Sequence, residues 1–497
     1  MLTAEFYIGV LAERRPSIRL GGHEQEAGRP RGRRRANQES GVTVMIVMKF
    51  GGTSVGSAER MRGVAKLVKE RFDRRPLVVA SAMSKVTDQL IKGARQALRR
   101  DAEADEVLLD LRKRHETTIN ELFSDAPTRT RLTAHVQSIL DELKTLYTGI
   151  YHLEELTPRS LDAIQAMGER ISCEIVAAAL KAEGVRAEAL DARSLLITDE
   201  SFGRAMPLMG EIEQRCKSEL QPMLETGEVP VLGGFIGSTL SGVTTTLGRG
   251  GSDWSAAIFG AALDAEEVQI WTDVDGMMTF DPRVVAGPMV ITEVTFDEAA
   301  ELAYFGAKVL HPATIRPAVE KGIPVRVLNS MNPKAAGTLV SARRAEGPSG
   351  PRAIAFKKGI TVVLVSQPKM LMASGFLVKV FEVFERNRTA VDLIATSEVS
   401  VSLTIDNAEQ LPPIKSDLGK LGEVRILRDM AIVSLVGRGF YRHPGLAGRM
   451  FHCLRDVNVA MISFGASDVN LSFVVEEADA ERAVLTLHKE FFEGGCA

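Results

Sequence analysis

The chain has 497 residues, 45% of them hydrophobic, so it can bury several cores and we expect about two to four domains. Its formal net charge of −3 argues against non-specific binding of nucleic acid, which needs a basic surface. No apolar run approaches the length of a membrane span, and the four cysteines are far apart without CxxC spacing. These features fit a protein of the reduced cytoplasm without structural zinc.

The first 44 residues differ from everything that follows. Their segment Arg29–Arg35 is basic, contains glycine and proline, and shows no apolar periodicity. We interpret 1–44 as a disordered extension or as the result of a mis-assigned start. The extension lacks the apolar core of a signal peptide, and acidic residues such as Glu13 and Glu39 argue against a transit peptide.

From Met45 the pattern alternates between strand and helix. Met45–Phe50 predicts a buried strand that leads into Gly51-Gly52, and Ala58–Phe72 predicts a helix with one apolar stripe. The loop is neither a GxGxxG fingerprint nor a Walker A loop, because Lys49 precedes the glycines. Close backbone approach, two hydroxyls and an ammonium group still favour a phosphate site, although Lys49 could be an edge lysine that only extends to solvent.

The stretch Thr244–Asp253 has the composition of an anion site. It follows Val229–Gly237, which we interpret as one buried strand, and it precedes a small-residue helix. Unpaired N–H groups and the helix dipole favour an anion in a loop of threonines and glycines at such a place. Arg249 can bind a carboxylate or phosphate through two hydrogen bonds, and Asp253 can accept from an ammonium group. The alternative is a glycine-rich turn with Ser252 as the helix N-cap.

Residues 85–227 are expected to be mostly helical. The small-residue helix Leu161–Ser172 carries Glu169, for which the local pattern favours an ordinary surface glutamate. Arg204 lies in the turn Ser201–Ala205, where it could serve a ligand or cap a helix.

Further along, acidic residues follow another strand. Glu267–Thr272 predicts a strand that ends at Asp273 and Asp275, at the edge where parallel sheets place ligands. The two carboxylates could bind a metal, or Asp275 could belong to an ordinary turn. Lys308 offers a second lysine, and His311 before a proline is better explained by a structural role than as a general base.

Together, four motifs in this order resemble those of the aspartate kinases, which belong to the amino acid kinase family: Lys49–Ser54, Thr244–Asp253, Trp271–Gly276 and Phe305–Pro312. The resemblance covers the chain from Met45 to its end and implies an α/β amino acid kinase fold, with a mainly parallel sheet sandwiched by helices, over 45–342. It implies ATP-dependent phosphorylation of the L-aspartate side chain to 4-phospho-L-aspartate, the first step towards lysine, threonine and methionine, with magnesium arriving on ATP. Alternatives are another acyl-phosphate kinase of this fold, acting on glutamate, acetylglutamate or carbamate, or an inactive amino-acid sensor.

The resemblance also implies roles for individual residues. Lys49, Arg249 and Asp253 would be catalytic, with Lys49 stabilising the transferred phosphoryl group. Aspartate would be held by Thr87, Glu169, Arg249, Gly250, Gly251, Ser252 and Asp253. The nucleotide would be lined by Lys49, Phe50, Gly51, Gly52, Thr272, Asp273, Met278, Arg283, Lys308 and Val309. Met278 stands where relatives carry an aromatic residue, and no protein ligand of a metal is assigned. Because a carboxylate with a pKa near ~4 is ionised at neutral pH, this chemistry needs no general base.

A linker over 343–351 precedes an internal repeat. Two copies of a βαββαβ unit, over 352–429 and 430–497, resemble paired ferredoxin-like ACT domains, which bind amino acids as regulators. The second copy lacks a final strand, so we predict that Arg352–Lys357 supplies it.

The first copy resembles the lysine pocket of lysine-sensitive, monofunctional aspartate kinases at Met370, Gly375, Phe376, Asp392, Thr396, Ser397 and Glu398. Ala373 stands where some relatives have a serine that contacts lysine. The resemblance therefore implies feedback regulation by lysine, with threonine as the second choice, and a homodimer or larger assembly through the ACT domains.

Overall fold

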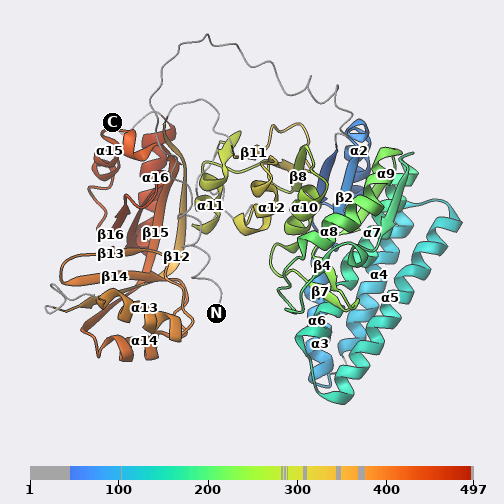
Figure 1. The fold of residues 1–497 in the computed structure, drawn as a ribbon, viewed down its shortest axis with the longest axis horizontal. Coiled ribbons are helices and arrows are strands. Elements are labelled where there is room, and N and C mark those ends of the chain that lie inside the picture. The colour runs from blue at the N-terminus through green and yellow to red at the C-terminus, as the bar shows by residue number, and fades with distance from the viewer. Residues whose placement is uncertain are drawn as a thin grey trace, which may run out of the picture. The chain divides into compact units, whose positions relative to one another are not determined.

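The computed structural model describes residues 45–101, 103–280, 284, 287, 289–305, 310–342, 349–367 and 375–493 (Figure 1). Several expectations lie outside the described residues, namely those for 1–44, Arg283, Lys308, Val309, Met370 and Ala373. Within the described ranges, no helix is both long enough and apolar enough to cross a membrane.

An eight-stranded sheet forms the centre of the N-terminal part, in the order β3-β5-β2-β1-β8-β10-β11-β9. The pairings are parallel except that between β10 and β11, which confirms the expected mainly parallel sheet. The strands are β1 (Ile46–Phe50), β2 (Pro76–Ala80), β3 (Ala187–Leu190), β5 (Val229–Gly233), β8 (Glu267–Thr272), β9 (Glu293–Thr295), β10 (Val325–Asn329) and β11 (Thr338–Ser341).

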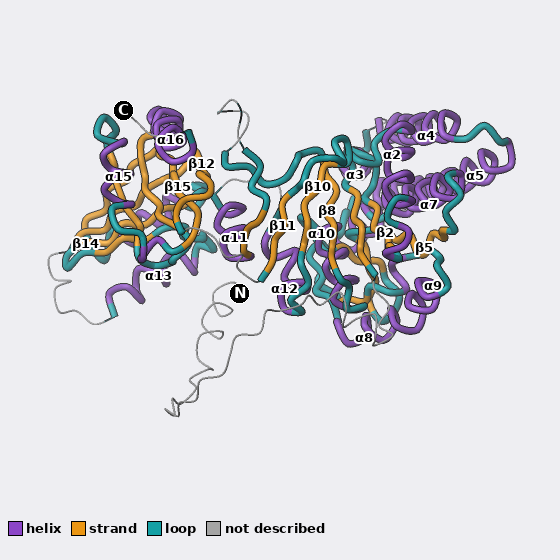
Figure 2. Tube along the Cα trace, turned by 90° about the horizontal axis from the view of Figure 1, so that it is seen from above, coloured by secondary structure: helices purple, strands orange, loops and turns teal. Residues whose placement is uncertain are grey.

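Helices cover both faces of this sheet, as the fully buried strand β1 requires. Val47 and Val268 face one helical layer, which consists of α8 (Met209–Arg215), α10 (Gly251–Ala262), α11 (Phe296–Tyr304) and α12 (Arg316–Glu320). Ile46 and Met48 face the other, which consists of α2 (Ala58–Lys69), α3 (Val86–Leu98), α4 (Glu103–Leu122), α5 (Ala126–Leu153) and α7 (Met167–Ala182) (Figure 2). Two shorter helices are α6 (Pro158–Gln165) and α9 (Gln221–Glu225).

Local chemistry fixes where several helices begin. Ser57 accepts a hydrogen bond from the third residue of α2 at 3.4 Å, and Asp125 caps α5 in the same way at 2.9 Å. The predicted helix Leu161–Ser172 is divided, because α6 ends at Gln165 and α7 begins at Met167. The backbone of Ala166 between them stays helical (φ −64°, ψ −18°), so the break is slight.

A smaller sheet corrects two expectations from the sequence. It contains β4 (Ile197–Thr198), β6 (Ile236–Thr239) and β7 (Thr244–Thr246). The run Val229–Gly237 is therefore two strands in different sheets, because Phe235 has a left-handed backbone (φ 69°) and turns the chain out of β5. The expected loop of threonines is also wrong at its start, since Thr244–Thr246 pairs antiparallel with β6.

The C-terminal part contains one six-stranded sheet, in the order β13-β14-β12-β15-β17-β16, and its pairings are antiparallel. Its strands are β12 (Gly350–Ser366), β13 (Ile394–Thr396), β14 (Ser400–Ile405), β15 (Glu423–Arg438), β16 (Val459–Phe464) and β17 (Asn470–Glu476). Four helices pack on it, α13 (Phe376–Arg386) and α14 (Leu411–Leu418) over the first copy and α15 (Leu446–Cys453) and α16 (Glu477–Phe492) over the second.

The long strands β12 and β15 join the two copies of the repeat. Ala353–Lys357 pairs with Ile432–Val436, which confirms that the segment before the first copy supplies a strand to the second. Thr361–Ser366, further along β12, pairs with β14 of the first copy. Because β12 begins at Gly350, the last two residues of the expected linker belong to the strand.

Candidate active site

Lys49 and Asp253 meet where β1 ends and α10 begins. The Lys49 Nζ lies 2.6 Å from the Asp253 Oδ1, and the two side chains are only 11% and 16% exposed. A Cβ at position 51 would lie 3.5 Å from this Nζ, so the ammonium lies directly beside the glycine loop. Two residues that the sequence predicts as catalytic thus form one ion pair.

The glycine loop after β1 packs against the loop between β2 and α3. The Ser84 N–H donates to the Gly52 carbonyl at 3.0 Å, and a Cβ on Gly52 would lie 2.9 Å from the Ala82 oxygen. Glycine is therefore required at position 52 by this close approach. The Gly51 N–H already donates to the Trp271 carbonyl at 3.1 Å, so a phosphate at this loop must use other donors.

The corner between β5 and β6 forms one wall of the site. The Phe235 N–H donates to the Ser255 Oγ, and this hydroxyl donates to the Gly251 carbonyl, both at 2.9 Å. A Cβ on Gly234 would come within 2.7 Å of the Ser252 Cβ. Gly234 and the Ser255 hydroxyl thus hold this corner against the start of α10.

Two glycines with positive φ shape the loop that carries Arg249. Gly248 has φ 80° and Gly250 has φ 73°, so both adopt the left-handed conformation that glycine adopts without strain. Gly250 is the N-cap of α10, which means that the alternative interpretation of Ser252 as the N-cap is wrong. Ser252 instead lies in the first turn of the helix, beside Asp253.

These elements enclose a pocket of about 250 Å³ that brings together most of the predicted substrate residues. It is lined by Lys49, Thr87, Glu169, Phe235, Gly248, Gly250, Gly251, Ser252 and Asp253. Arg249 is exposed at the edge, and within the described chain its guanidinium has no ion-pair partner. Sequence reasoning missed Phe235 and Gly248; the glycines before Phe235 were a signal that the strand breaks there.

Glu169 is the most perturbed group of this pocket. It is 3% exposed, so the expectation of an ordinary surface glutamate is wrong, because the first turn of α7 packs beneath the loop after β2. Its Oε1 accepts the Ala82 N–H at 3.1 Å, while its buried Oε2 has no partner among the described residues. Burial raises the pKa of the Glu169 carboxyl to about 8, against the opposing effect of the Ala82 N–H.

The predicted nucleotide residues lie along the end of β8. The Thr272 carbonyl accepts the Ser330 N–H at 2.9 Å, and its hydroxyl donates to the exposed Asp273 at 3.2 Å. Met278 follows in a short bridge with Val290. The remaining predicted nucleotide residues after this point, Arg283, Lys308 and Val309, lie outside the described residues.

Asp275 has a structural role in this region. Its Oδ1 accepts hydrogen bonds from the Asn329 and Asn332 amides at 2.7 and 3.1 Å. Asn329 is the last residue of β10 and Asn332 follows it, so the carboxylate joins the segment after β8 to the end of β10. This favours the turn interpretation of Asp275 over a metal ligand, and the described residues contain no cluster of His, Cys, Asp and Glu suited to a metal.

Comparison with known proteins identifies the family. The model of the amino acid kinase family matches residues 44–329, and that of the ACT domain matches 433–491. Aspartokinase 1, chloroplastic, of Arabidopsis thaliana is 41% identical over 92% of this chain and 81% of its own length. The chain belongs to the amino acid kinase family and, within it, to the aspartokinases.

Solved aspartokinases have the same architecture. Aspartokinase III of E. coli in complex with aspartate and ADP superimposes with a TM-score of 0.77 at 36% identity, over 90% of this chain and 100% of that one. The same enzyme in complex with lysine and aspartate gives a TM-score of 0.75 at 37% identity, over 90% and 99%. The resemblance inferred from the four motifs is thereby confirmed.

The first ACT copy of this aspartokinase contains the predicted effector residues that the structure describes. Asp392 is the most enclosed: its side chain is 3% exposed, and its Oδ1 accepts from the Tyr304 hydroxyl at 2.6 Å and from the Lys357 Nζ at 3.2 Å. Its Oδ2 is buried without a hydrogen-bond partner among the described residues. The other effector residues are Gly375, the N-cap of α13 (φ 83°), half-buried Phe376, and Thr396, Ser397 and Glu398, which are exposed.

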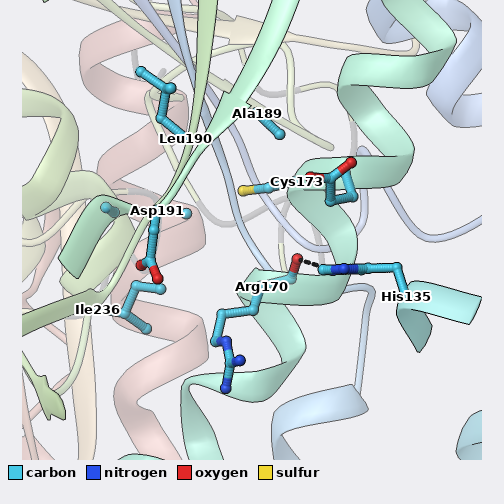
Figure 3. A pocket seen from close by; sticks show the side chains of 10 residues that line it. His135, Arg170, Cys173, Ala189, Leu190, Asp191 and Ile236 are labelled. Carbon is cyan, nitrogen blue, oxygen red and sulfur yellow. Dashed lines mark hydrogen bonds between the residues drawn. The ribbon is translucent and has the colours of Figure 1, made fainter. Parts of the chain in front are cut away.

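A second pocket of about 140 Å³ is lined by residues of α5, α7, β3 and the corner after β5, among them His135, Arg170 and Cys173 (Figure 3). Its polar groups are already paired: a His135 ring nitrogen lies 3.3 Å from the Arg170 carbonyl, and the Arg170 guanidinium donates to Glu142 at 2.8 Å. Burial raises the pKa of the Cys173 thiol, which keeps it neutral. None of the substrate residues predicted from the sequence lines this pocket.

Proposed function

We propose that this chain transfers the γ-phosphoryl group of ATP to the side-chain carboxylate of L-aspartate, giving 4-phospho-L-aspartate and ADP. A carboxylate oxygen forms the new bond to the γ-phosphorus while the bond from that phosphorus to the ADP oxygen breaks. The carrying observation is the pocket in which Lys49, Asp253 and Glu169 converge without a histidine or cysteine among the lining residues. Acyl-phosphate formation from an ionised carboxylate needs cations and positioning, and it needs no base or nucleophile from the protein.

The proposed roles follow from charge and position. Lys49 stabilises the phosphoryl group during its transfer, because its ammonium lies near the end of β1 beside the glycine loop. Asp253 holds that ammonium in place through the 2.6 Å ion pair. Glu169 accepts the substrate ammonium with its Oε2, which has no partner in the described part of the chain, and Arg249 binds a carboxylate through its guanidinium.

The nucleotide is proposed to lie along Thr272 and Asp273, next to the end of β1. ATP enters as its magnesium complex, because magnesium prefers phosphate and carboxylate oxygens and keeps several waters. The parallel pairing of β1 with β8 supports this arrangement, since Phe50 is in register with Trp271 and both strands end at one edge.

Lysine is the proposed feedback effector, and the first ACT copy is its proposed site. The Oδ2 of Asp392, which has no hydrogen-bond partner among the described residues, can accept an ammonium group, and Glu398 offers a second carboxylate. E. coli aspartokinase III has been solved with lysine, which supports the assignment. A homodimer or larger assembly is also proposed, because the first copy exposes apolar side chains on neighbouring elements: Leu377, Val378 and Phe381 of α13, Ile394 of β13, and Val399. The cytoplasmic location expected from the cysteines stays a prediction.

The test of activity traps the acyl phosphate with hydroxylamine in the presence of magnesium and ATP. Aspartate should give the hydroxamate, and glutamate, acetylglutamate and carbamate should not. Absence of an aspartate-dependent hydroxamate would refute the proposed function, whereas a product with glutamate alone would move the chain to another branch of the family.

The test of regulation adds lysine or threonine to the same assay. Lysine should inhibit, and Asp392→Asn should raise the lysine concentration needed for half-inhibition. Asp406→Asn is the matched control, because Asp406 also contacts Lys357, at 2.8 Å, and is not a predicted effector residue. Inhibition by threonine alone, or an equal change in both variants, would remove the lysine assignment and leave the kinase activity standing.

A further inference from the structure

The turn that carries Arg204 is rigidly built. The carboxylate of Asp199 accepts the N–H groups of Ser201 and Met206 at 3.1 and 2.9 Å, and also the Ser201 hydroxyl at 2.9 Å. The Asp199 N–H in turn donates to the Met206 carbonyl at 2.9 Å. One side chain thus closes the turn from both ends, so the backbone of Arg204 is fixed before any ligand arrives.

A buried carboxylate fastens this turn to β7, the strand that leads to Arg249. Asp162 is 1% exposed, and its Oδ2 accepts the N–H groups of Gly203 and Thr246 at 2.8 and 3.0 Å. Its Oδ1 accepts the Thr246 hydroxyl at 2.7 Å. Burying a carboxylate is costly, and burial raises the pKa of Asp162 although its three hydrogen bonds oppose the shift. Apolar packing could hold the turn against β7 without the desolvation cost of a buried carboxylate. The hydrogen bonds of Asp162 therefore favour one specific position of the turn.

The fastened turn lies directly against the substrate loop. The Ala205 N–H donates to the Thr246 carbonyl at 2.9 Å, which continues the pairing of the two segments. A Cβ on Gly248 would lie 2.9 Å from the Gly203 oxygen and 3.8 Å from the Cα of Arg204. Gly248 lines the substrate pocket, so Arg204 begins at the edge of that pocket.

The charges at this edge leave two guanidinium groups available. Arg204 and Arg249 are both exposed, and in the described ranges neither has an ion-pair partner. The acidic neighbour Asp253 is already paired with Lys49. Aspartate brings two carboxylates, and the reacting one must lie near Lys49 and the nucleotide. Its α-carboxylate is then left for the arginines.

We propose that Arg204 is a specificity-determining residue of the kinase site, which binds the α-carboxylate of aspartate together with Arg249. The proposal rests on the proposed function, because it concerns the substrate of that reaction. A guanidinium offers a carboxylate two parallel hydrogen bonds, which a lysine ammonium cannot reproduce. Arg204 and Arg249 together distinguish a free α-carboxylate from an amide at the same carbon.

The test compares aspartate with L-isoasparagine, whose α-carboxylate is replaced by an amide while the ammonium and side-chain carboxylate remain. For Arg204→Ala, kcat/KM with aspartate should fall about 10- to 100-fold, mainly through KM, since a hydrogen bond to a charged group has that size. With isoasparagine the same variant should match the unmodified enzyme, and KM for ATP should not change. Arg204→Lys should restore only part of the loss.

Arg159→Ala is the control, because Arg159 is an exposed arginine of α6 outside this turn. Two results would overturn the proposal in an active enzyme: an unchanged KM for aspartate in Arg204→Ala, or an equal loss with both substrates. An equal loss with both substrates would show that the substitution acts through folding or through the overall electrostatic potential of the site. A preparation in which even the unmodified chain gives no hydroxamate would instead refute the proposed function, so the two failures are distinguishable.

Discussion

Glu169 should make aspartate binding depend on pH near neutrality. Burial raises its pKa to about 8, so at pH 7 the empty site holds about ten protonated carboxyls for each ionised one. Ionising the group at pH 7 then costs about 1.4 kcal/mol, because one pKa unit corresponds to that free energy. The substrate ammonium needs the ionised form, so KM for aspartate should rise about tenfold for each pH unit below 8 and level off above it.

Three titratable groups lie near Glu169 and could also affect how aspartate binding depends on pH. Lys49 and Asp253 line the same pocket from β1 and α10, and Cys173 lies one turn along α7. KM and kcat for aspartate would be measured between about pH 6 and 9 by a coupled assay of ADP release, since hydroxylamine itself titrates in this range. Glu169→Gln should show a higher KM that no longer varies with pH. A flat KM in the unmodified enzyme, or the same slope in Glu169→Gln, would refute the assignment.

The same shift predicts the sign of a stability effect. The folded pKa of Glu169, about 8, exceeds its ordinary value of 4.5. A raised pKa means that the contribution to stability is complete below pH 4.5 and is lost as pH rises through 8. At pH 7 the loss amounts to at most about 3 kcal/mol. Glu169→Gln has no charge to desolvate, so its Tm should exceed that of the unmodified enzyme at pH 8, and the difference should shrink towards pH 5.

Three further substitutions distinguish residues that act in catalysis or binding from residues that only stabilise the fold. Lys49→Ala should lose turnover far more than aspartate affinity, and an equal loss in kcat and KM would assign Lys49 to ground-state binding. Asp162→Asn should lower the free energy of unfolding by about 1 to 3 kcal/mol and raise KM for aspartate, because its amide nitrogen cannot accept the N–H groups that the carboxylate accepts; an unchanged KM would detach Asp162 from the site. Gly93→Ala should lower the unfolding temperature without changing KM, because its Cβ would lie 2.4 Å from the Tyr147 hydroxyl; an unchanged Tm would show that Tyr147 moves aside at no cost.

The sequence predicts the elements whose pattern is local. Met45–Phe50 and Glu267–Thr272 are apolar runs of strand length, and both are buried strands of the main sheet. The repeat predicts the second ACT copy together with its borrowed strand, since the number of strands in each copy can be counted. The resemblance to the aspartate kinases predicts Lys49 and Asp253 for one site, and in the structure a 2.6 Å ion pair joins them.

Features that depend on contacts distant in sequence could not be predicted. The run Val229–Gly237 contains Gly233-Gly234, which signal a break, but its place at Phe235 depends on the packing of this ring on Gly251, whose Cβ would lie 2.6 Å from the Phe235 Cδ2. Glu169 has the local pattern of a surface residue, and only the packing of α7 under the loop after β2 buries it. In both cases the deciding neighbour is too far away in sequence for periodicity to report it.

The charge of the substrate pocket links these observations. Lys49 and Asp253 cancel each other, and Glu169 is mostly neutral at pH 7, so the empty lining has almost no net charge. Aspartate with a net charge of about −1 must approach the anionic complex of ATP in this neutral pocket, and charges of one sign repel each other. Extra cations at the pocket edge are therefore needed for binding, and Arg249 and Arg204 are the exposed groups placed to supply them. When the substrate ammonium arrives, its positive charge lowers the pKa of Glu169, which releases its proton to solvent, and the ionised carboxylate then neutralises the one positive group that aspartate brings.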